Sequence, residues 1–420
     1  MTSDVEAQLH AYAELTVKIA VNLQPGQRLL IVGALANGGA PLEAAPLVRH
    51  IAASAYDAGA PLVETIWGDE GLQLARFGHA PRRSFDEYSA WFPAALVEHV
   101  EAGHAVLSVY ANDPDLLRDQ SADLVSAVQQ STSQAVRPFR EHISRNATNW
   151  AVIAAPSPRW AAKVFPHAPS DEGVARLWDA IRRLCRLDHA SPIEAWAAHL
   201  DRLAQVSEYL NHRRYQSLRY SGPGTDLTLG LPGGHLWVSG RSTSRSGIVF
   251  TANLPTEEVF TIAHRDVAEG VVRSTKPLSY GGTLVDDFSL RFSGGRVVEA
   301  RAQQGEAVLR RLLDTDPGAS RLGEIALVPG SSPVAQSGVL FYNTLFDENA
   351  ASHVALGTAY KFTLEGGDRM DDEEFARAGG NQSGVHVDFM IGSAELDVDG
   401  VLPGGTTEPV MRQGEWAFRA

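Results

Sequence analysis

Four short β-rich runs in the first half of the chain are separated by stretches with helical spacing of apolar side chains. The β-rich runs are 28–33, 61–69, 105–113 and 149–156. The helical stretches are 4–23, 41–60 and about 170–212, and the first of them ends at Pro25-Gly26. Strands that alternate with helix-length segments predict βαβ units on a mostly parallel sheet. We therefore expect an α/β N-terminal domain.

The pattern changes near residues 215–225, where short strands punctuated by glycine replace the βα alternation. The strand-like runs are 226–231, 235–240, 247–254, 288–295, 296–302, 324–330, 338–346, 385–393 and 394–400. Helical spacing returns only at 303–315 and about 349–361. This pattern predicts a β-rich α+β region. We place the domains at 1–220 (α/β) and 221–420 (β-rich), and we expect the polar, glycine-rich segment 365–384 to be a surface loop, with a lid or rim role as the alternative.

Composition narrows the class of protein. The 420 residues include 36 basic and 50 acidic side chains, a net charge of −14 that argues against nucleic acid as a partner. The single cysteine, Cys185, excludes an internal disulfide and a cysteine-rich metal site. No run reaches the ~18 apolar residues of a membrane span, and the N-terminus lacks the features of a signal peptide. We expect a cytoplasmic protein without a membrane partner.

The stretch VHVDFMIGS at 385–393 carries the clearest local signal for chemistry. If it is a strand, alternate residues share a face, so His386 and Asp388 project together. Imidazole nitrogen and carboxylate oxygen both suit zinc, cobalt or manganese. A histidine hydrogen-bonded to a neighbouring aspartate on a solvated face explains the pair equally well.

A second signal lies in LFYNTLFDENAASHVALGTAY at 340–360. The apolar spacing predicts a helix on which His353 and Tyr360 lie almost in line, with Gly357 leaving open space between them. Such a face would form one wall of a pocket. Glu348 lies near the helix start, where it is either a site residue or a carboxylate stabilised by the helix dipole.

Two further carboxylates precede apolar strands. Glu324 stands before IALV, either at a buried strand start, where an unpaired charge is costly, or at a rim facing water. Glu257 and Glu258 stand before Val259 in NLPTEEVF. In an extended segment they point to opposite faces, so one faces water while the other turns inward to a cation. The pattern does not choose between them.

Together these stretches supply four or five carboxylates, two histidines and one tyrosine, all in the β-rich half. Two divalent ions that share a carboxylate and lower the pKa of a water molecule need such a set of ligands. A tyrosine hydroxyl can stabilise the oxyanion of a tetrahedral intermediate. The inventory therefore fits a two-metal hydrolytic site.

In these stretches the sequence resembles the aminopeptidase T family of metallopeptidases, the AmpS/PepS group. The matching stretches are NLPTEEVFT, KPLSYGGTLV, GEAVLRRLLDTDPGASRLGEIALVP, LFYNTLFDENAASHVALGTAY and HVDFMIGS, which span about 253–393. The resemblance implies an exopeptidase that removes N-terminal amino acids from peptides. It also implies two divalent metal ions per site (zinc, cobalt or manganese), a β-rich catalytic domain and a homodimer with an enclosed site.

Carried over onto this sequence, the resemblance assigns roles to individual residues. The implied metal ligands are Glu258, Glu324, Glu348, His353, His386 and Asp388. Glu324 matches the carboxylate that bridges the two metal ions and is also implied in catalysis, and Tyr360 matches the oxyanion stabiliser. The resemblance thus selects Glu258 rather than Glu257.

Two other classes of function compete with the peptidase interpretation. One is a metal- or peptide-binding protein that has lost catalysis on the same scaffold, which the presence of both Glu324 and Tyr360 disfavours. The other is a nucleotide-dependent enzyme that uses the α/β half, for which fold analogy is the only support.

Overall fold

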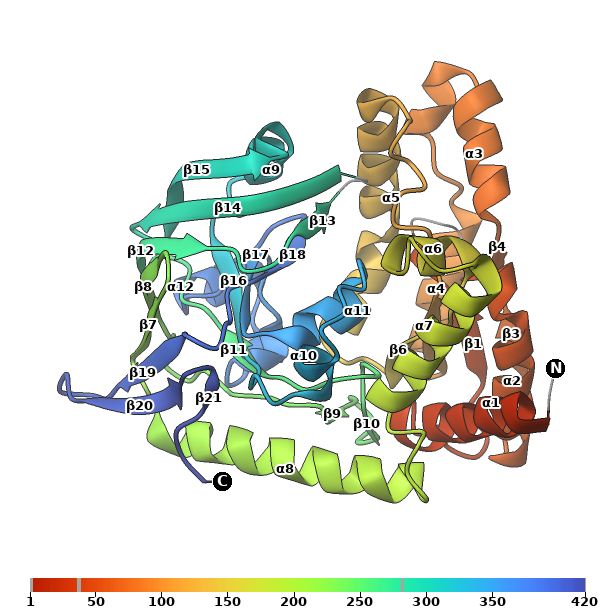
Figure 1. Ribbon diagram of the computed structural model, residues 1–420, viewed down its shortest axis with the longest axis horizontal. Helices are drawn as coiled ribbons and strands as arrows, with labels where there is room; N and C mark the ends of the chain where they lie inside the picture. Colours follow the sequence, from red (N-terminus) through yellow and green to blue (C-terminus); the bar gives the residue numbers. More distant parts are fainter. Residues whose placement is uncertain (1–2, 36–38, 281–282, 420) are drawn as a thin grey trace. The chain divides into compact units, whose positions relative to one another are not determined.

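The computed structural model describes residues 3–35, 39–280 and 283–419, so residues 281 and 282 of the KPLSYGGTLV stretch lie outside the described part. Contacts divide the chain into two compact units (Figure 1), Met1–His199 with Arg241–Pro255, and Leu200–Gly240 with Thr256–Ala420. Neither unit is one continuous stretch of chain. The boundary predicted near residue 220 therefore stays a prediction, and the units are described separately.

The first unit is built on a four-stranded parallel sheet in the order β3-β1-β5-β6. Its strands are β1 (Leu29–Val32), β3 (Val63–Thr65), β5 (Ala105–Tyr110) and β6 (Trp150–Ala154). All four residues of β1 are buried, as expected for a central parallel strand covered on both faces. The predicted mostly parallel sheet is therefore confirmed.

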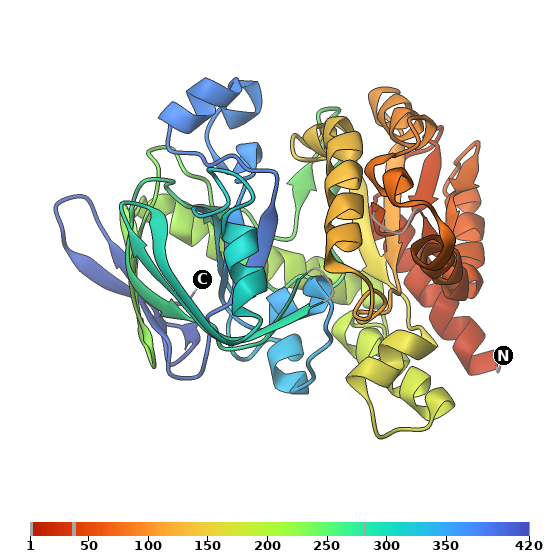
Figure 2. The same ribbon diagram turned by 90° about the horizontal axis from the view of Figure 1, so that it is seen from above.

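Helices lie on both faces of this sheet (Figure 2). They are α1 (Ser3–Leu15), continued by the π-helix η1 (Thr16–Ala20), α2 (Ala45–Asp57), α3 (Glu70–His79), α4 (Trp91–Glu101), α5 (Ala122–Ile143), α6 (Pro158–Val164) and α7 (Ser170–Leu184). Leu30 and Val32 of β1 pack with Leu96 of α4 and Phe139 of α5 in one apolar cluster. The helix α8 (Pro192–Arg213) follows, in agreement with the helical pattern at 170–212.

The second unit contains a nine-stranded sheet in the order β13-β14-β12-β8-β7-β19-β20-β21, with β15 pairing β14. Its strands are β7 (Ser217–Gly222), β8 (Thr225–Gly230), β12 (Ala268–Arg273), β13 (Leu278–Tyr280), β14 (Thr283–Ser293), β15 (Arg296–Gln304), β19 (Asp397–Val401), β20 (Thr407–Arg412) and β21 (Glu415–Trp416). The helix α9 (Glu306–Leu313) follows β15, as the helical pattern at 303–315 predicts. The β-rich character of this half is confirmed.

A smaller antiparallel sheet in the same unit has the order β11-β16-β17-β18. Its strands are β11 (Val259–Ile262), β16 (Leu322–Leu327), β17 (His353–Gly357) and β18 (His386–Met390). The two sheets share one hydrophobic core, in which Phe288 of β14 and Phe389 of β18 stand 5.3 Å apart between ring centroids. This core leaves the opposite face of the small sheet available for polar side chains.

Three sequence predictions in this half are wrong. Residues 349–361 do not form a helix, because 353–357 pair as β17 with strands on both sides. Residues 338–346 do not form a strand and instead lead into the short helix α11 (Thr344–Asp347), which Asn343 caps. Residues 235–240 make only isolated bridges. In the first two cases long-range pairing and capping override local propensity.

The segment 365–384 is only partly a surface loop. It contains the 3₁₀ turn η7 (Gly367–Arg369) and the helix α12 (Asp372–Arg377), which starts with a capping box. Phe375 of α12 is fully buried in a small cluster with Ile262 of β11 and Leu364. The segment therefore packs onto the four-stranded sheet, on the face that carries Ile262.

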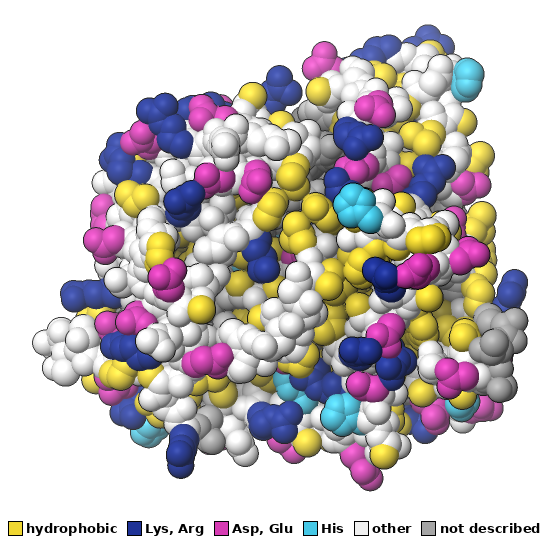
Figure 3. Space-filling view, in the orientation of Figure 1, with side chains coloured by type: hydrophobic (Ala, Val, Ile, Leu, Met, Phe, Trp, Pro, Cys, Tyr) yellow, Lys and Arg dark blue, Asp and Glu magenta, His cyan; other side chains and the backbone are white. Residues whose placement is uncertain are grey.

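On the face shown in Figure 3, basic and acidic side chains are interspersed rather than gathered by sign. Among the described residues, no helix combines the length and the apolar composition needed to cross a membrane.

Candidate metal centre

The four-stranded sheet separates its residues onto two faces because side chains alternate along each strand. Ile325 of β16, together with Val354 and Leu356 of β17, lies in the hydrophobic core. The residues that alternate with them along the strands, which include Glu324 and His353, point to the other face. One face of the sheet therefore holds the fold together, and the other carries the candidate chemistry.

Hydrogen-bonded partners across the sheet form rows on this second face. One row runs through all four strands and consists of Ile262, Glu324, Ala355 and Asp388. Cross-strand partners lie about 5 Å apart between Cβ atoms, so the small Ala355 separates two carboxylates and leaves open space between them. His353 occupies the next row, and His386 is paired with Gly357.

Gly357 has a structural reason to be glycine. Its φ is +103°, and a Cβ atom there would lie 2.1 Å from the carbonyl oxygen of Val385. A side chain at this position would push β17 away from β18 beside His386. The open space beside the histidine is thus a requirement of the strand pairing.

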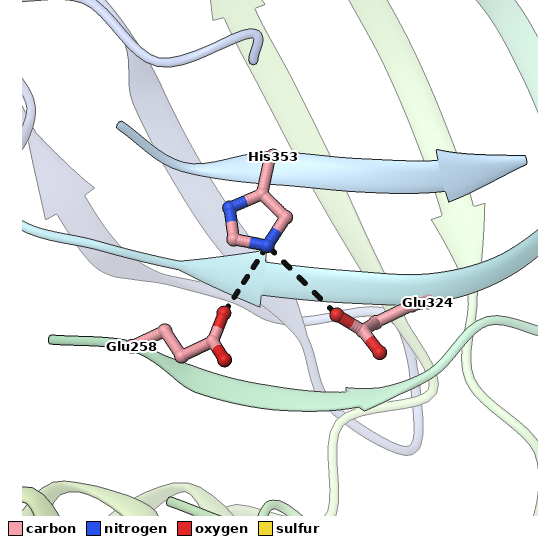
Figure 4. Close-up of side chains that lie close together, drawn as sticks. All are labelled: Glu258, Glu324 and His353. Atoms are coloured by element: carbon pink, nitrogen blue, oxygen red, sulfur yellow. Dashed lines mark ion pairs between the residues drawn. The ribbon is translucent and has the colours of Figure 1, made fainter. Parts of the chain in front are cut away.

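The first histidine lies between two glutamates from neighbouring strands. Nε2 of His353 is 3.1 Å from Oε2 of Glu258 and 3.8 Å from Oε1 of Glu324 (Figure 4). Glu258 comes from the segment that enters β11, Glu324 from β16 and His353 from β17. All three side chains are buried, with 1% exposure for His353.

The second histidine shares Glu324 with the first. Nε2 of His386 is 3.8 Å from Oε2 of Glu324 and 3.4 Å from Oδ1 of Asp388. The two oxygens of Glu324 therefore lie nearest to different histidines. As predicted, His386 and Asp388 are two residues apart on one strand and on the same face.

A backbone carbonyl oxygen accepts a hydrogen bond from the Nδ1 atom of each imidazole ring. Nδ1 of His353 lies 3.1 Å from the carbonyl oxygen of Ala351, and Nδ1 of His386 lies 2.8 Å from that of Thr358. A carbonyl oxygen only accepts, so each Nδ1 carries a proton and donates it. In the neutral ring Nε2 is then a lone-pair donor that faces carboxylates, the usual arrangement of a metal-binding histidine.

Without a metal ion, the histidines of this cluster keep their protons. Burial alone would lower the pKa of His353, but the nearby Glu258 carboxylate raises it to about 10. Burial alone would lower the pKa of His386, but the nearby Asp388 carboxylate raises it to about 10. Burial raises the pKa of Glu324 to about 8, although His386 opposes the shift.

Glu348 and Asp388 complete the charged cluster. Glu348 lies in the 3₁₀ turn η5 (Glu348–Ala350) just before β17 and is buried. Burial raises its pKa well above the ordinary value, and the like charges of Glu258 and Asp388 add to the shift. Burial would also raise the pKa of Asp388, but His386 holds it below its usual range.

The donor set fits divalent cations. Oε2 of Glu258 and Oδ1 of Asp388 are buried and make no hydrogen bond of good geometry, although a histidine Nε2 is near each. Candidate ligand atoms of Glu258, Glu324 and His353 lie within 4.8 Å of one another, and so do those of Glu324, His386 and Asp388. Mixed nitrogen and oxygen ligands suit zinc, cobalt or manganese.

Tyr360 was predicted to share a helix with His353, but it comes from a different element. It stands before the 3₁₀ turn η6 (Lys361–Thr363) and shares no helix with His353. Its ring centroid is 4.9 Å from that of His386, and it stacks on Phe362 at 5.2 Å. Burial and the surrounding carboxylates raise the pKa of Tyr360 well above 10, so its hydroxyl stays protonated and can donate.

Five of the side chains predicted from the sequence lie together at one face of the small sheet, namely Glu258, Glu324, His353, His386 and Asp388. Glu348 and Tyr360 come from a turn and a loop and belong to neither ligand cluster, and two details are corrected. Glu257 does not face water, since its exposure of 5% is close to the 6% of Glu258. Glu324 lies inside β16 rather than at a rim. The sequence offered Asn349 only as a possible helix cap, whereas in the structure it is fully buried directly after Glu348.

Comparison with known proteins agrees with this geometry. The chain matches the thermophilic metalloprotease (M29) family over residues 5–416. It is 49% identical over 413 residues to aminopeptidase 2 of Geobacillus stearothermophilus, with 98% of each chain covered. It is 46% identical over 408 residues to aminopeptidase T of Thermus thermophilus, with 97% of this chain and 98% of the relative covered.

A solved structure leads to the same result. Wild-type AmpT from Thermus thermophilus superposes with a TM-score of 0.91 at 45% identity, covering 98% of this chain and 99% of that one. The fold and these relatives define a metal-dependent aminopeptidase, a hydrolase. The chain belongs to the thermophilic metalloprotease (M29) family, and its resemblance to the aminopeptidase T, AmpS and PepS group is thereby confirmed.

Proposed function

We propose that this metal-dependent aminopeptidase hydrolyses N-terminal amino acids from peptides through a site for two divalent ions. The observation that carries the proposal is the position of Glu324. It belongs to both clusters of candidate ligands, and its two oxygens lie nearest to different histidines. A carboxylate placed in this way is suited to bridge two cations.

The ligands would be Glu258, Glu324, Glu348, His353, His386 and Asp388. When bound, zinc, cobalt or manganese would polarise the scissile carbonyl and lower the pKa of a water molecule. The neutral form of each imidazole offers Nε2, because Nδ1 is already engaged with a backbone carbonyl. A peptide with a free N-terminus suits this acidic site, since its ammonium group is cationic.

The chain's own side chains would then act on the peptide. The oxygen of water forms a bond to the carbonyl carbon, and Tyr360 donates its hydroxyl proton in a hydrogen bond to the developing oxyanion. A carboxylate of the site takes a proton from the attacking water and delivers it to the leaving amine. The C–N bond breaks, and a free amino acid and a shortened peptide result.

We also propose a cytoplasmic homodimer, on the strength of the family resemblance and the single buried cysteine. A mass measurement in solution tests the dimer, because a monomer at working concentration would contradict it.

Metal removal tests the function itself. After exhaustive dialysis against chelator, the protein should lose cleavage of aminoacyl-chromogenic substrates and recover it with zinc, cobalt or manganese. Metal analysis of the purified protein should give two ions per chain. Full activity in chelator would refute the proposal. A chain that binds metal yet releases no amino acid from any substrate would instead be a catalytically inactive metal- or peptide-binding protein on the same scaffold.

A further inference from the structure

Two segments that carry candidate ligands are joined by one buried amide side chain. Oδ1 of Asn349 accepts the backbone N–H of Glu257 at 2.6 Å, across 92 positions of sequence. Nδ2 of Asn349 donates to the carbonyl oxygen of Leu345 at 3.0 Å. Asn349 is 0% exposed and follows Glu348 directly, while Glu257 directly precedes Glu258. One side chain thus fixes the backbone next to two glutamates.

We propose that Asn349 is a positioning residue that holds Glu258 and Glu348 at ligand distance before any metal ion arrives. This inference rests on the proposed function, because it concerns the same ligands. Asn349 itself need not touch a metal ion or the substrate. Its role is to tie the strand entry at 257–258 to the turn at 348–350.

The need for such a tie follows from topology. Glu258 lies at the entry to β11, which pairs with β16, whereas Glu348 lies in the turn η5 and belongs to no strand. The hydrogen bond from Glu257 N–H to Asn349 joins the backbones of these two segments directly. The hydroxyl of Ser332 also donates to the carbonyl oxygen of Asn349 at 3.0 Å, but this bond does not reach the 257–258 segment. A ligand set held in place in advance loses less conformational entropy on binding.

Asn349→Ser is the variant that separates the long-range contact from the local one. A serine hydroxyl can bond the carbonyl four residues earlier, here that of Leu345, but it is too short to reach Glu257. We expect the metal-free variant to fold and to bind Mn²⁺ or Zn²⁺ about 10- to 100-fold more weakly in a competition titration, the usual effect of losing an outer-shell partner.

Two control variants test whether the effect is specific. Asn343→Ala removes the cap of α11, a hydrogen bond to the N–H of Leu345, without touching the 257–258 segment. Ser332→Ala removes the hydroxyl behind Asn349 and keeps the amide contact with Glu257. We expect both to leave metal affinity within about twofold of wild type, even where their melting temperatures fall. Equal weakening in all three variants would show general loosening and would overturn the proposal.

A measurement on the wild-type protein does not depend on the folding of a variant. In the metal-free chain the amide proton of Glu257 should exchange slowly with solvent, because the bond to Asn349 is formed before metal binds. Fast exchange that becomes slow only after metal addition would overturn the proposal. If wild-type protein bound no metal at all, the proposed function would fail, whereas the exchange result would still report on the contact.

Discussion

The charge balance around Glu324 leads to an unusual prediction: removing this carboxylate should stabilise the metal-free protein. Burial raises the pKa of Glu324 from the ordinary 4.5 to about 8. Between these two values the folded state binds more protons than the unfolded state, so stability falls as pH rises through this window. The carboxylate therefore weakens the metal-free fold at neutral pH and has no such effect below pH 4.5.

The magnitude follows from the distance between pH 7 and the ordinary pKa. Each pKa unit corresponds to about 1.4 kcal/mol, so retaining a proton on Glu324 costs roughly 3 kcal/mol at pH 7. Glu324→Gln carries no charge and avoids this cost. For a unit of this size each kcal/mol shifts the melting temperature by about 2–4 °C, so the metal-free variant should melt roughly 6–12 °C higher at pH 7.

Metal should narrow or close this difference in stability. At a free metal concentration of about 100 Kd the wild-type protein gains about 2.7 kcal/mol. The glutamine variant keeps one neutral oxygen where a carboxylate faced both histidines, so it should gain far less and lose turnover. Without metal the variant is the more stable protein, and with metal the wild type gains ground on it or overtakes it.

Thermal unfolding followed by circular dichroism checks this metal-dependent change. Chelator-dialysed wild type and Glu324→Gln are melted near pH 7 and near pH 4.5, with and without manganese or zinc. Glu373→Gln is the matched control, because its side chain is 89% exposed and its loss should shift stability by no more than about 0.5 kcal/mol. The reasoning is refuted if the metal-free variant melts below wild type at pH 7, or if both gain equally from metal.

Three further predictions concern the same site. Glu258→Gln should lose metal binding and activity, while Glu257→Gln should lose much less; titrations showing the reverse would place the ligand one residue earlier. Tyr360→Phe should lower kcat by about 10²- to 10³-fold with metal affinity unchanged, as for one lost oxyanion donor, and a change confined to KM in steady-state assays would contradict that role. Ala355→Val should fill the space between two carboxylates and weaken metal binding by roughly 5- to 150-fold, because overpacking typically costs about 1–3 kcal/mol, whereas normal affinity in a calorimetric titration would show that the space is not used.

Elements with one strong periodicity could be predicted from the sequence. The parallel sheet of the first unit, helices α7 and α8, and the strand that carries His386 and Asp388 all match their patterns. In each of these the local apolar spacing agrees with the tertiary environment. Such segments can be predicted from the sequence because their local conformational preference agrees with their burial in the folded protein.

The strand β17 could not be predicted for the opposite reason. Its residues His353–Gly357 follow an alanine-rich stretch whose spacing also suits a helix. Its strand conformation depends on pairing with β16 and β18, which are distant in sequence. Short segments of this kind adopt the structure that their partners impose. The helical prediction placed His353 and Tyr360 on one face, whereas their proximity to the site arises from two separate elements.

Resemblance, rather than pattern, selected the carboxylates. Sequence alone left Glu257 and Glu258 equivalent, and burial does not separate them either, since both are nearly inaccessible. The distinction comes from register: Glu258 lies 3.1 Å from His353, and Glu257 belongs to neither cluster of candidate ligands among the described residues. A charge pattern therefore indicates that a site exists, but only the pairing of strands determines which charge enters it.

The same pairing explains why this sheet face suits metal chemistry. Glu324 and Asp388 lie on either side of Ala355, and His386 is paired with Gly357, so small residues separate the candidate ligands across the strands. Larger side chains there would fill the volume that cations need, while the apolar residues on the reverse face stabilise the sheet against the repulsion of its carboxylates. Stability and charge are thus assigned to opposite faces of the same four strands. We therefore expect truncations on the core face to lower stability with or without metal, whereas removal of a carboxylate such as Glu324 from the other face should weaken metal binding without destabilising the metal-free fold.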